Sequence, residues 1–193
     1  MTAMSLAPSA LGCWHGEIWL TDDVLTDPHA YLDRVAEYPR TRLWPVLVPR
    51  GGLGVPPDAV VLPEAARTAV DRHDPQAEAG IAGAVMVANR KPGYRLGLVE
   101  AARPADVPAR LGRPGLSAVL RSWEDRFGAT LVVLGFDTIE LSVSAPPRNQ
   151  ARALTVAAEH RAFSLPTFAD QPGNLREYAS DLVQTRHWRF SWA

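Results

Sequence analysis

The stretch from Gly115 to Pro147 constrains the fold most, because its hydrophobic period changes within a few residues. One set of apolar residues recurs at the spacing of a single helical face: Leu116, Val119, Leu120, Trp123 and Phe127. Polar residues, Arg126 among them, take the other side, and Gly128 follows where a left-handed residue commonly ends a helix. Residues 129–134 are then apolar and β-branched, and residues 138–145 alternate between apolar and polar. These patterns predict a helix followed by two antiparallel strands.

Three runs of sequence carry a family resemblance: RSWEDRFGATLVVLGFDTIELSVSAPP, VAAEHRAF and the terminal WRFSWA. They resemble the bacterial DUF4253 domain over roughly residues 95–193, and the resemblance implies a fold topology but no assigned activity. Two motifs differ from the family pattern. Ser164-Leu165-Pro166 stands where members often carry Cys-Pro-Asp, and the chain ends in Ser191-Trp192-Ala193 where they tend to carry Trp-Trp-Asp. No role of that cysteine or of those aspartates is therefore carried over to this chain.

Further strands follow from short apolar or alternating segments, and the fold class follows from the strands together. They are predicted near residues 43–48, 94–99 and 187–192. Pro45 marks the first of them as an edge or bulged strand, because proline cannot donate to the strand ladder. We expect an α+β fold with a mixed, mainly antiparallel sheet and helices packed on one face. Residues 94–193 are expected to form the DUF4253-like domain, and residues 1–93 either the N-terminal part of the same fold or an appended subdomain.

Start signals predict two further helices. Asp27-Pro28 places an N-cap residue before a proline at the first helical position. Asn174 with Glu177 three residues later resembles a capping box. The stretch before the turn at Asn89 is rich in alanine and glycine, and we expect residues 85–88 to form a short strand there.

Composition and charge exclude several classes of protein. Hydrophobic residues make up 47% of the 193 residues and the net charge is −1, which is typical of a globular domain and not of a nucleic-acid-binding one. No run approaches the roughly 20 apolar residues of a membrane span, so neither a membrane nor nucleic acid is expected as a partner.

Arginine far outnumbers lysine, which suggests a bacterial source with a high-GC genome. The single cysteine, Cys13, cannot form an intramolecular disulfide and fits a cytoplasmic location.

No motif for metal, cofactor or covalent catalysis is present. The five histidines lack the spacing of a metal site, so no metal and no cofactor is expected. The glycine-rich run RGGLGVPPD carries Pro57 where a dinucleotide-binding loop requires its third glycine. No Gly-x-Ser-x-Gly elbow of a serine hydrolase occurs either.

Glu159 is the carboxylate most suited to a special role, because it lies near the end of a predicted helix whose residues are mostly small. If that helix packs on the sheet, the carboxylate needs a partner, and Arg121 and Arg161 are the candidates. It then forms either a structural ion pair or a ligand contact or general base. Glu124 and Asp125 lie on the polar side of their helix and are expected to be solvated.

The tryptophans are the second unusual feature, with six in the chain. Trp188 and Trp192 alternate with polar residues in the predicted last strand, so they share a face that either closes the core or lines a pocket. Such a pocket suits a small apolar ligand or a protein partner. The candidate ligand-binding residues are Arg121, Glu159, His160, Trp188 and Trp192.

The sequence is compatible with three kinds of function. It does not indicate an oligomeric state. The first is a non-catalytic binding or interaction protein, of the immunity or resistance kind, that occupies a protein partner. The second is an enzyme acting on a small molecule, with Glu159 or a histidine as its acid–base residue in an aromatic pocket. The third is a protein that sequesters a small molecule. The absence of a catalytic signature favours the first.

Overall fold

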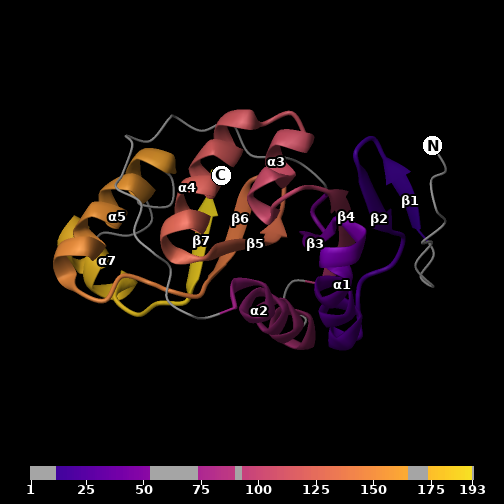
Figure 1. The fold of residues 1–193 in the computed structure, drawn as a ribbon, viewed down its shortest axis with the longest axis horizontal. Helices are drawn as coiled ribbons and strands as arrows, with labels where there is room; N and C mark the ends of the chain where they lie inside the picture. Colours follow the sequence, from indigo (N-terminus) through magenta and orange to yellow (C-terminus); the bar gives the residue numbers. More distant parts are fainter. Residues whose placement is uncertain (1–11, 53–73, 90–92, 165–173, 193) are drawn as a thin grey trace.

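The computed structural model describes residues 12–52, 74–89, 93–164 and 174–192, which form one seven-stranded sheet with helices on both faces (Figure 1). The strand order is β1-β2-β4-β3-β5-β6-β7, and neighbouring strands are antiparallel except for the parallel pair β3 and β5. The strands are β1 (Gly12–His15), β2 (Ile18–Thr21), β3 (Leu43–Pro49), β4 (Tyr94–Glu100), β5 (Ala129–Leu134), β6 (Thr138–Val143) and β7 (His187–Ser191). The five predicted strands are therefore present, together with an N-terminal hairpin.

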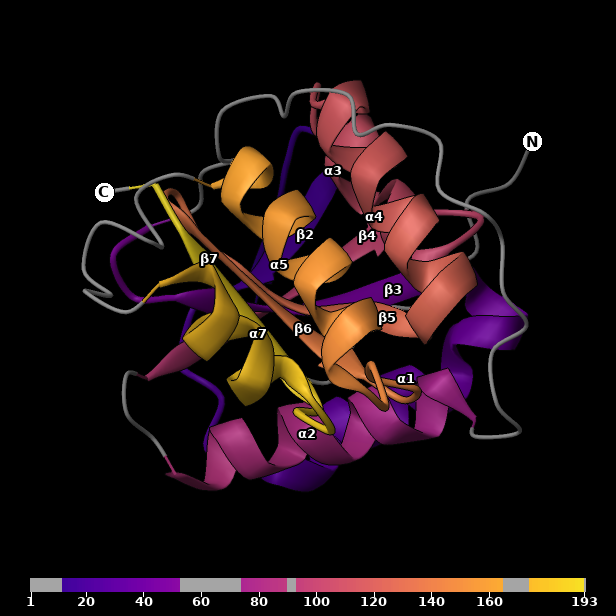
Figure 2. The ribbon, with the colours of Figure 1, turned by 90° about the vertical axis from the view of Figure 1, so that its left-hand side faces the viewer.

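Two groups of helices enclose the sheet. The described helices are α1 (Pro28–Thr41), α2 (Pro75–Asn89), α3 (Val107–Arg110), α4 (Pro114–Phe127), α5 (Gln150–Phe163) and α7 (Leu175–Leu182), with a 3-10 turn, η1, at Pro104–Asp106. Figure 2 shows the strands between α2 on one side and α4 and α5 on the other. The predicted α+β class and the mixed, mainly antiparallel sheet are confirmed. Helices α4 and α5 cover one face, and α1 and α2 pack side by side on the second face as well. None of the described helices is long and apolar enough to span a bilayer.

The helix ends form as their sequence signals predict. The side chain of Asp27 accepts a hydrogen bond from the backbone N–H of His29 at 2.9 Å and caps α1. Asn174 and Glu177 form a complete capping box at the start of α7. Gly128 ends α4 in the left-handed conformation, with φ of 57°. Local chemistry therefore defines where these helices begin and end.

The expectation that Pro45 lies in an edge or bulged strand is wrong. Strand β3 is central, with β4 on one side and β5 on the other. The indole Nε1 of Trp44 donates a hydrogen bond of 2.8 Å to the backbone oxygen of Leu131 on β5. Pro45 itself has no backbone N–H to donate to the neighbouring strand. The indole N–H of the adjacent Trp44 supplies a hydrogen bond to β5 instead.

The short strand expected at residues 85–88 is also wrong, because these residues belong to α2. Alanine favours a helix, and the small residues of α2 lie on the buried face, among them Gly80 and Gly83. A side chain at position 83 would overlap the ring of Tyr31 on α1. The small residues therefore allow α1 and α2 to pack closely, which the local pattern does not reveal.

Strand β7 sends alternate side chains to opposite faces of the sheet, and this alternation positions the sites described below. Trp188 and Phe190 are buried against α4 and α5, through ring contacts with Trp123. His187 and Arg189 point to the other face, where α2 lies. The directly paired residue of Arg189 on β6 is Glu140, which therefore shares that second face.

The close contact between α1 and α2 predicts an unusual response to alanine. Replacing Gly83 with alanine should lower the free energy of unfolding by about 1–3 kcal/mol, because the new methyl group overlaps Tyr31. Alanine is by itself the better helix former by about 1 kcal/mol. Gly80→Ala is the matched control on the same helix, because its methyl group would meet Leu32 at 3.3 Å and could be accommodated. Urea unfolding followed by circular dichroism measures both, and equal stabilities would contradict this packing.

Candidate functional site

Two groups of polar side chains flank β6 and β7, one on each face of the sheet. The buried cluster lies between the sheet and α4, α5 and α7, and comprises Trp123, Arg126, Glu159, His160, Tyr178 and Trp188. The β6–β7 pocket lies on the opposite face, between these strands and α2. The first contains most of the residues that the sequence singled out, and the second contains none of them.

Glu159 forms a buried ion pair with Arg126. Both side chains are nearly inaccessible, at 7% and 6% exposure. The guanidinium donates to both carboxylate oxygens, through Nη1 to Oε1 at 2.8 Å and through Nη2 to Oε2. The indole Nε1 of Trp123 adds a third hydrogen bond, of 2.9 Å, to Oε2. The carboxylate is thus fully paired, which is what a charge requires when it is removed from water.

The predicted partners of Glu159, Arg121 and Arg161, are wrong. Arg121 donates to Asp106 Oδ1 at 2.6 Å on the surface, and Arg161 is exposed. Arg126 was assigned to the polar side of α4, yet it lies three residues after Trp123 and shares its buried face. The periodicity of the apolar residues alone does not identify an arginine that is buried because it has a partner.

His160 is enclosed by aromatic rings next to this pair. Its ring centroid lies 4.5 Å from that of Trp188 and 4.9 Å from that of Trp123, and Nδ1 lies 2.9 Å from the hydroxyl oxygen of Tyr178. Burial, and secondly the charge of Arg126, lower the pKa of His160 from 6.5 to about 3. The imidazole is therefore neutral at physiological pH. Within the described part of the chain, its Nε2 has no hydrogen-bond partner.

The other predicted site residues lie at different places. Trp192 is partly buried and packs on the ring of Phe163, at 5.2 Å between centroids. Arg121 lies apart from the buried cluster, in its surface pair. The structure thus brings Glu159, His160 and Trp188 together, and a ligand-binding role for these five residues stays a prediction.

Glu124 and Asp125 are not simply solvated as expected, because both bind Arg103. Its guanidinium donates to Glu124 Oε2 at 2.7 Å and to Asp125 Oδ1 at 2.5 Å. Burial raises the pKa of Glu124 above its ordinary value, although the charge of Arg103 opposes this change. These contacts join the start of η1 to α4.

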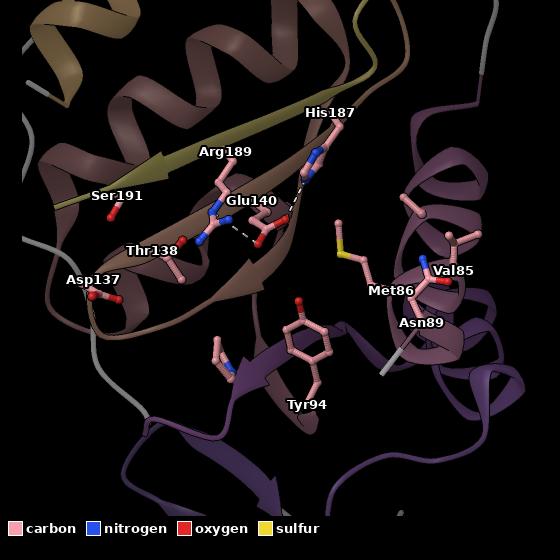
Figure 3. A pocket seen from close by; sticks show the side chains of 12 residues that line it. Val85, Met86, Asn89, Tyr94, Asp137, Thr138, Glu140, His187, Arg189 and Ser191 are labelled. Atoms are coloured by element: carbon pink, nitrogen blue, oxygen red, sulfur yellow. Dashed lines mark hydrogen bonds and ion pairs between the residues drawn. The ribbon is translucent and has the colours of Figure 1, made fainter. Parts of the chain in front are cut away.

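The β6–β7 pocket has a volume of about 670 Å³, within the range of pockets that bind small molecules (Figure 3). One wall is the exposed side of α2 and is mostly apolar, formed by Ala82, Val85, Met86 and Asn89. The other wall is polar and comes from the β6–β7 pair and the turn before it: Asp137, Thr138, Glu140, His187, Arg189 and Ser191. Pro49 and Tyr94 complete the lining between the two walls. The pocket can therefore receive a molecule with an apolar and a polar side.

Glu140 is shielded from solvent more than the basic residues His187 and Arg189 beside it. Its side chain is 12% exposed and lies between His187 and Arg189 (Figure 3). His187 Nε2 is 2.7 Å from Oε2, and Arg189 Nε is 3.9 Å from Oε1. The second distance is too long for a hydrogen bond. Arg189 is therefore ion-paired with Glu140, but its terminal nitrogens make no hydrogen bond to a described residue.

Tyr94 supplies an uncharged polar group from β4. Its hydroxyl points toward the space between Glu140 and Met86 in Figure 3, and it has no hydrogen-bond partner within the described residues. Burial raises the pKa of Tyr94 above its ordinary value, and the negative charge of Glu140 adds to this effect. The phenol therefore keeps its proton and can donate it in a hydrogen bond.

Sequence reasoning missed this pocket. The alternation in residues 138–145 places Glu140 on the polar side of its strand, and the alternation of the last strand does the same for His187 and Arg189. Those signals locate the polar faces, but they do not reveal that β6 and β7 are neighbours or that α2 stands opposite. Among the residues that the structure describes, no three His, Cys, Asp or Glu side chains gather as a metal site.

Comparison with known proteins gives one match. A family model described as "Domain of unknown function (DUF4253)" matches residues 95–193. No curated protein and no solved structure is similar enough to count as a match. The matched segment holds the whole buried cluster and the polar wall of the β6–β7 pocket, whereas α2 precedes it.

The buried ion pair predicts a large loss of stability when one partner is removed. Glu159→Ala should lower the free energy of unfolding by about 3–5 kcal/mol, because Arg126 then stays buried without a counter-charge. Arg121→Ala, which breaks an exposed pair, should cost less than about 1 kcal/mol and is the control. Denaturant unfolding measures both values. Equal small effects would mean that water reaches Arg126 in solution.

The lowered pKa of His160 predicts a pH dependence of stability. Between about pH 6.5 and pH 3, the unfolded chain binds a proton at this residue and the folded chain does not. The free energy of unfolding should therefore fall as the pH falls, by up to roughly 1.4 kcal/mol per pH unit from this residue alone. Denaturant unfolding at several pH values between about pH 7 and about pH 4 gives the free energy of unfolding as a function of pH. This free energy should depend less on pH in His160→Leu than in the unchanged protein. The exposed His29→Leu is the control, and a slope that only the control alters would refute the assignment.

Proposed function

Because the chain belongs to the DUF4253 family, whose description states that its function is unknown, we propose a function from the site itself: the protein binds a small organic molecule in the β6–β7 pocket. The observation that carries this proposal is the pairing of an apolar helical wall with a polar strand wall around one space. That combination is typical of ligand sites, in which apolar area gives affinity and a few polar groups orient the ligand.

The polar groups of the pocket support this proposal because two of them make no hydrogen bond within the described residues. The Tyr94 hydroxyl and the terminal nitrogens of Arg189 make no hydrogen bond to a described residue, although the Arg189 guanidinium is ion-paired with Glu140, so a ligand can bind them without breaking an existing hydrogen bond. Val85 and Met86 face them from α2 and offer apolar area. The ligand expected here therefore has a hydrogen-bonding group at one side and hydrocarbon at the other.

The buried cluster supports a structural role instead. Both oxygens of Glu159 are taken up by Arg126 and Trp123, and aromatic rings surround His160. A ligand at Glu159 would have to replace this ion pair, at a cost of several kcal/mol. We therefore place the ligand in the pocket rather than at the residues predicted from the sequence.

A protein partner is the second candidate, and the exposed apolar residues near the pocket favour it. Val85 lines the pocket, Ile81 lies one turn earlier on α2, and Phe136 precedes Asp137 of the polar wall; all three are exposed. Native mass spectrometry of the gently purified protein separates the two candidates. A bound small molecule supports the first, and a co-purifying protein at fixed stoichiometry supports the second.

Filling the pocket should abolish ligand binding. We expect Val85→Trp to weaken the binding of fragments, detected by ligand-observed NMR, by about tenfold or more, because the indole occupies space beside Met86. Ile81→Trp is the matched control. It introduces the same side chain at a similarly exposed apolar position of α2, 60% against 53% exposure, but outside the lining. Equal binding by the two variants would place the ligand elsewhere.

A further inference from the structure

Two side chains of opposite charge lie next to each other in the polar wall of the β6–β7 pocket. Glu140 and Arg189 are directly paired across the two strands, and both line the pocket. Glu140 Oε1 and Arg189 Nε are 3.9 Å apart, so the two groups attract each other without forming a hydrogen bond. Each of them therefore keeps hydrogen-bonding capacity that a ligand can use.

The carboxylate of Glu140 is an incompletely used acceptor. His187 Nε2 lies 2.7 Å from Oε2, whereas Oε1 accepts no hydrogen bond within the described residues. Because the side chain is only 12% exposed, water compensates this oxygen poorly. A charged donor such as an ammonium group is the partner that a shielded carboxylate oxygen binds most strongly.

Tyr94 adds a second acceptor beside this oxygen. The residue is only 5% exposed, yet its hydroxyl makes no hydrogen bond within the described residues and points toward the space between Glu140 and Met86 (Figure 3). Burial raises the pKa of Tyr94 and the negative charge of Glu140 raises it further, whereas the positive charge of Arg189 has a smaller, opposite effect. Negative charge thus dominates at the hydroxyl, whose oxygen can accept a hydrogen bond from a cationic donor.

Arg189 supplies the complementary donors. Its planar guanidinium can bind a carboxylate through two parallel hydrogen bonds, and its terminal nitrogens make no hydrogen bond to a described residue. A ligand with a carboxylate alone would also meet the negative charges of Glu140 and Asp137, which both line the pocket. A ligand with an ammonium group alone would meet the positive charge of Arg189. A ligand that carries both groups side by side satisfies both charges of the strand pair.

We infer that the β6–β7 pocket binds a free α-amino acid with a large apolar side chain, and this inference rests on the binding function proposed above. In an α-amino acid the ammonium and carboxylate groups are bonded to one carbon, so neighbouring partners can bind both at once. The ammonium group donates to Glu140 Oε1 and to the Tyr94 oxygen, and the carboxylate accepts from Arg189. The side chain packs on Val85 and Met86 of the apolar wall.

Three ligands that share a phenyl group test this inference on the full chain. Phenylalanine carries both charges, phenethylamine lacks the carboxylate, and phenylpropanoate lacks the ammonium group. Phenylalanine should bind most tightly. Loss of the ammonium group should weaken binding by about tenfold or more, because the shielded Glu140 then has no charged donor. Loss of the carboxylate should weaken it by about threefold, because the exposed Arg189 is screened by water. Titrations followed by ligand-observed NMR give the dissociation constants.

Two variants separate the contributions of the two charges. Glu140→Gln should weaken the binding of phenylalanine and phenethylamine by about tenfold, but not that of phenylpropanoate. Arg189→Gln should weaken phenylalanine and phenylpropanoate by about threefold, but not phenethylamine. Val85→Trp should block all three ligands, and Ile81→Trp none of them. This crossed pattern supports the inference, because a damaged fold would weaken all three ligands alike.

Tighter binding of phenethylamine or phenylpropanoate than of phenylalanine overturns the inference. So does a weakening of all three ligands in both Glu140→Gln and Arg189→Gln. If other fragments bind in a manner blocked by Val85→Trp while none of the three ligands binds, the inference fails and the proposed binding function stands. If no fragment binds either, both proposals fail.

Discussion

The buried pair between Arg126 and Glu159 is the interaction on which the layering of this protein depends. It joins α4 to α5 directly over the aromatic face of β7. A charge in such a position is tolerated only with a complete set of partners, so the two helices have one arrangement in which the pair is satisfied. Trp123 contributes to both parts of this layer, because its indole N–H bonds Glu159 while its ring stacks on Phe190. The polar contact thereby defines how the apolar core is closed.

This arrangement determines what the opposite face of the sheet presents. With Trp188 and Phe190 held in the core, the residues between and beside them must point toward α2. A shift of one residue in the pairing of β6 with β7 would exchange the two sets of side chains and bury Arg189 among aromatic rings. Core packing and the composition of the pocket are therefore two consequences of one strand register.

Elements with strong local signals could be predicted from the sequence. Residues 129–134 form a strand with those bounds, and the helix before it has the expected buried stripe. The predictions from sequence were wrong where contacts with a distant part of the chain determine the local structure. The small residues of α2 form a helix against which Tyr31 of α1 packs closely, and Pro45 lies in a central strand beside Trp44, whose indole donates a hydrogen bond to β5. The pocket combines residues from five elements and the turn before β6, so no local pattern could have shown it.

The position of β3 in the sheet has a consequence for the unit in which this chain can fold. Residues 95–193 match the family, yet β4 lies apart from β5, β6 and β7, since β3 is inserted between them. A fragment confined to the matched segment would hold β4 without either of its neighbours, β2 and β3, and the separate group β5-β6-β7 with the backbone N–H and C=O groups of β5 exposed at its edge. Unpaired strand edges of this kind pair readily with strands of other chains. The matched segment thus omits a central strand of the sheet, and β3 joins the strands on either side of it into one continuous sheet.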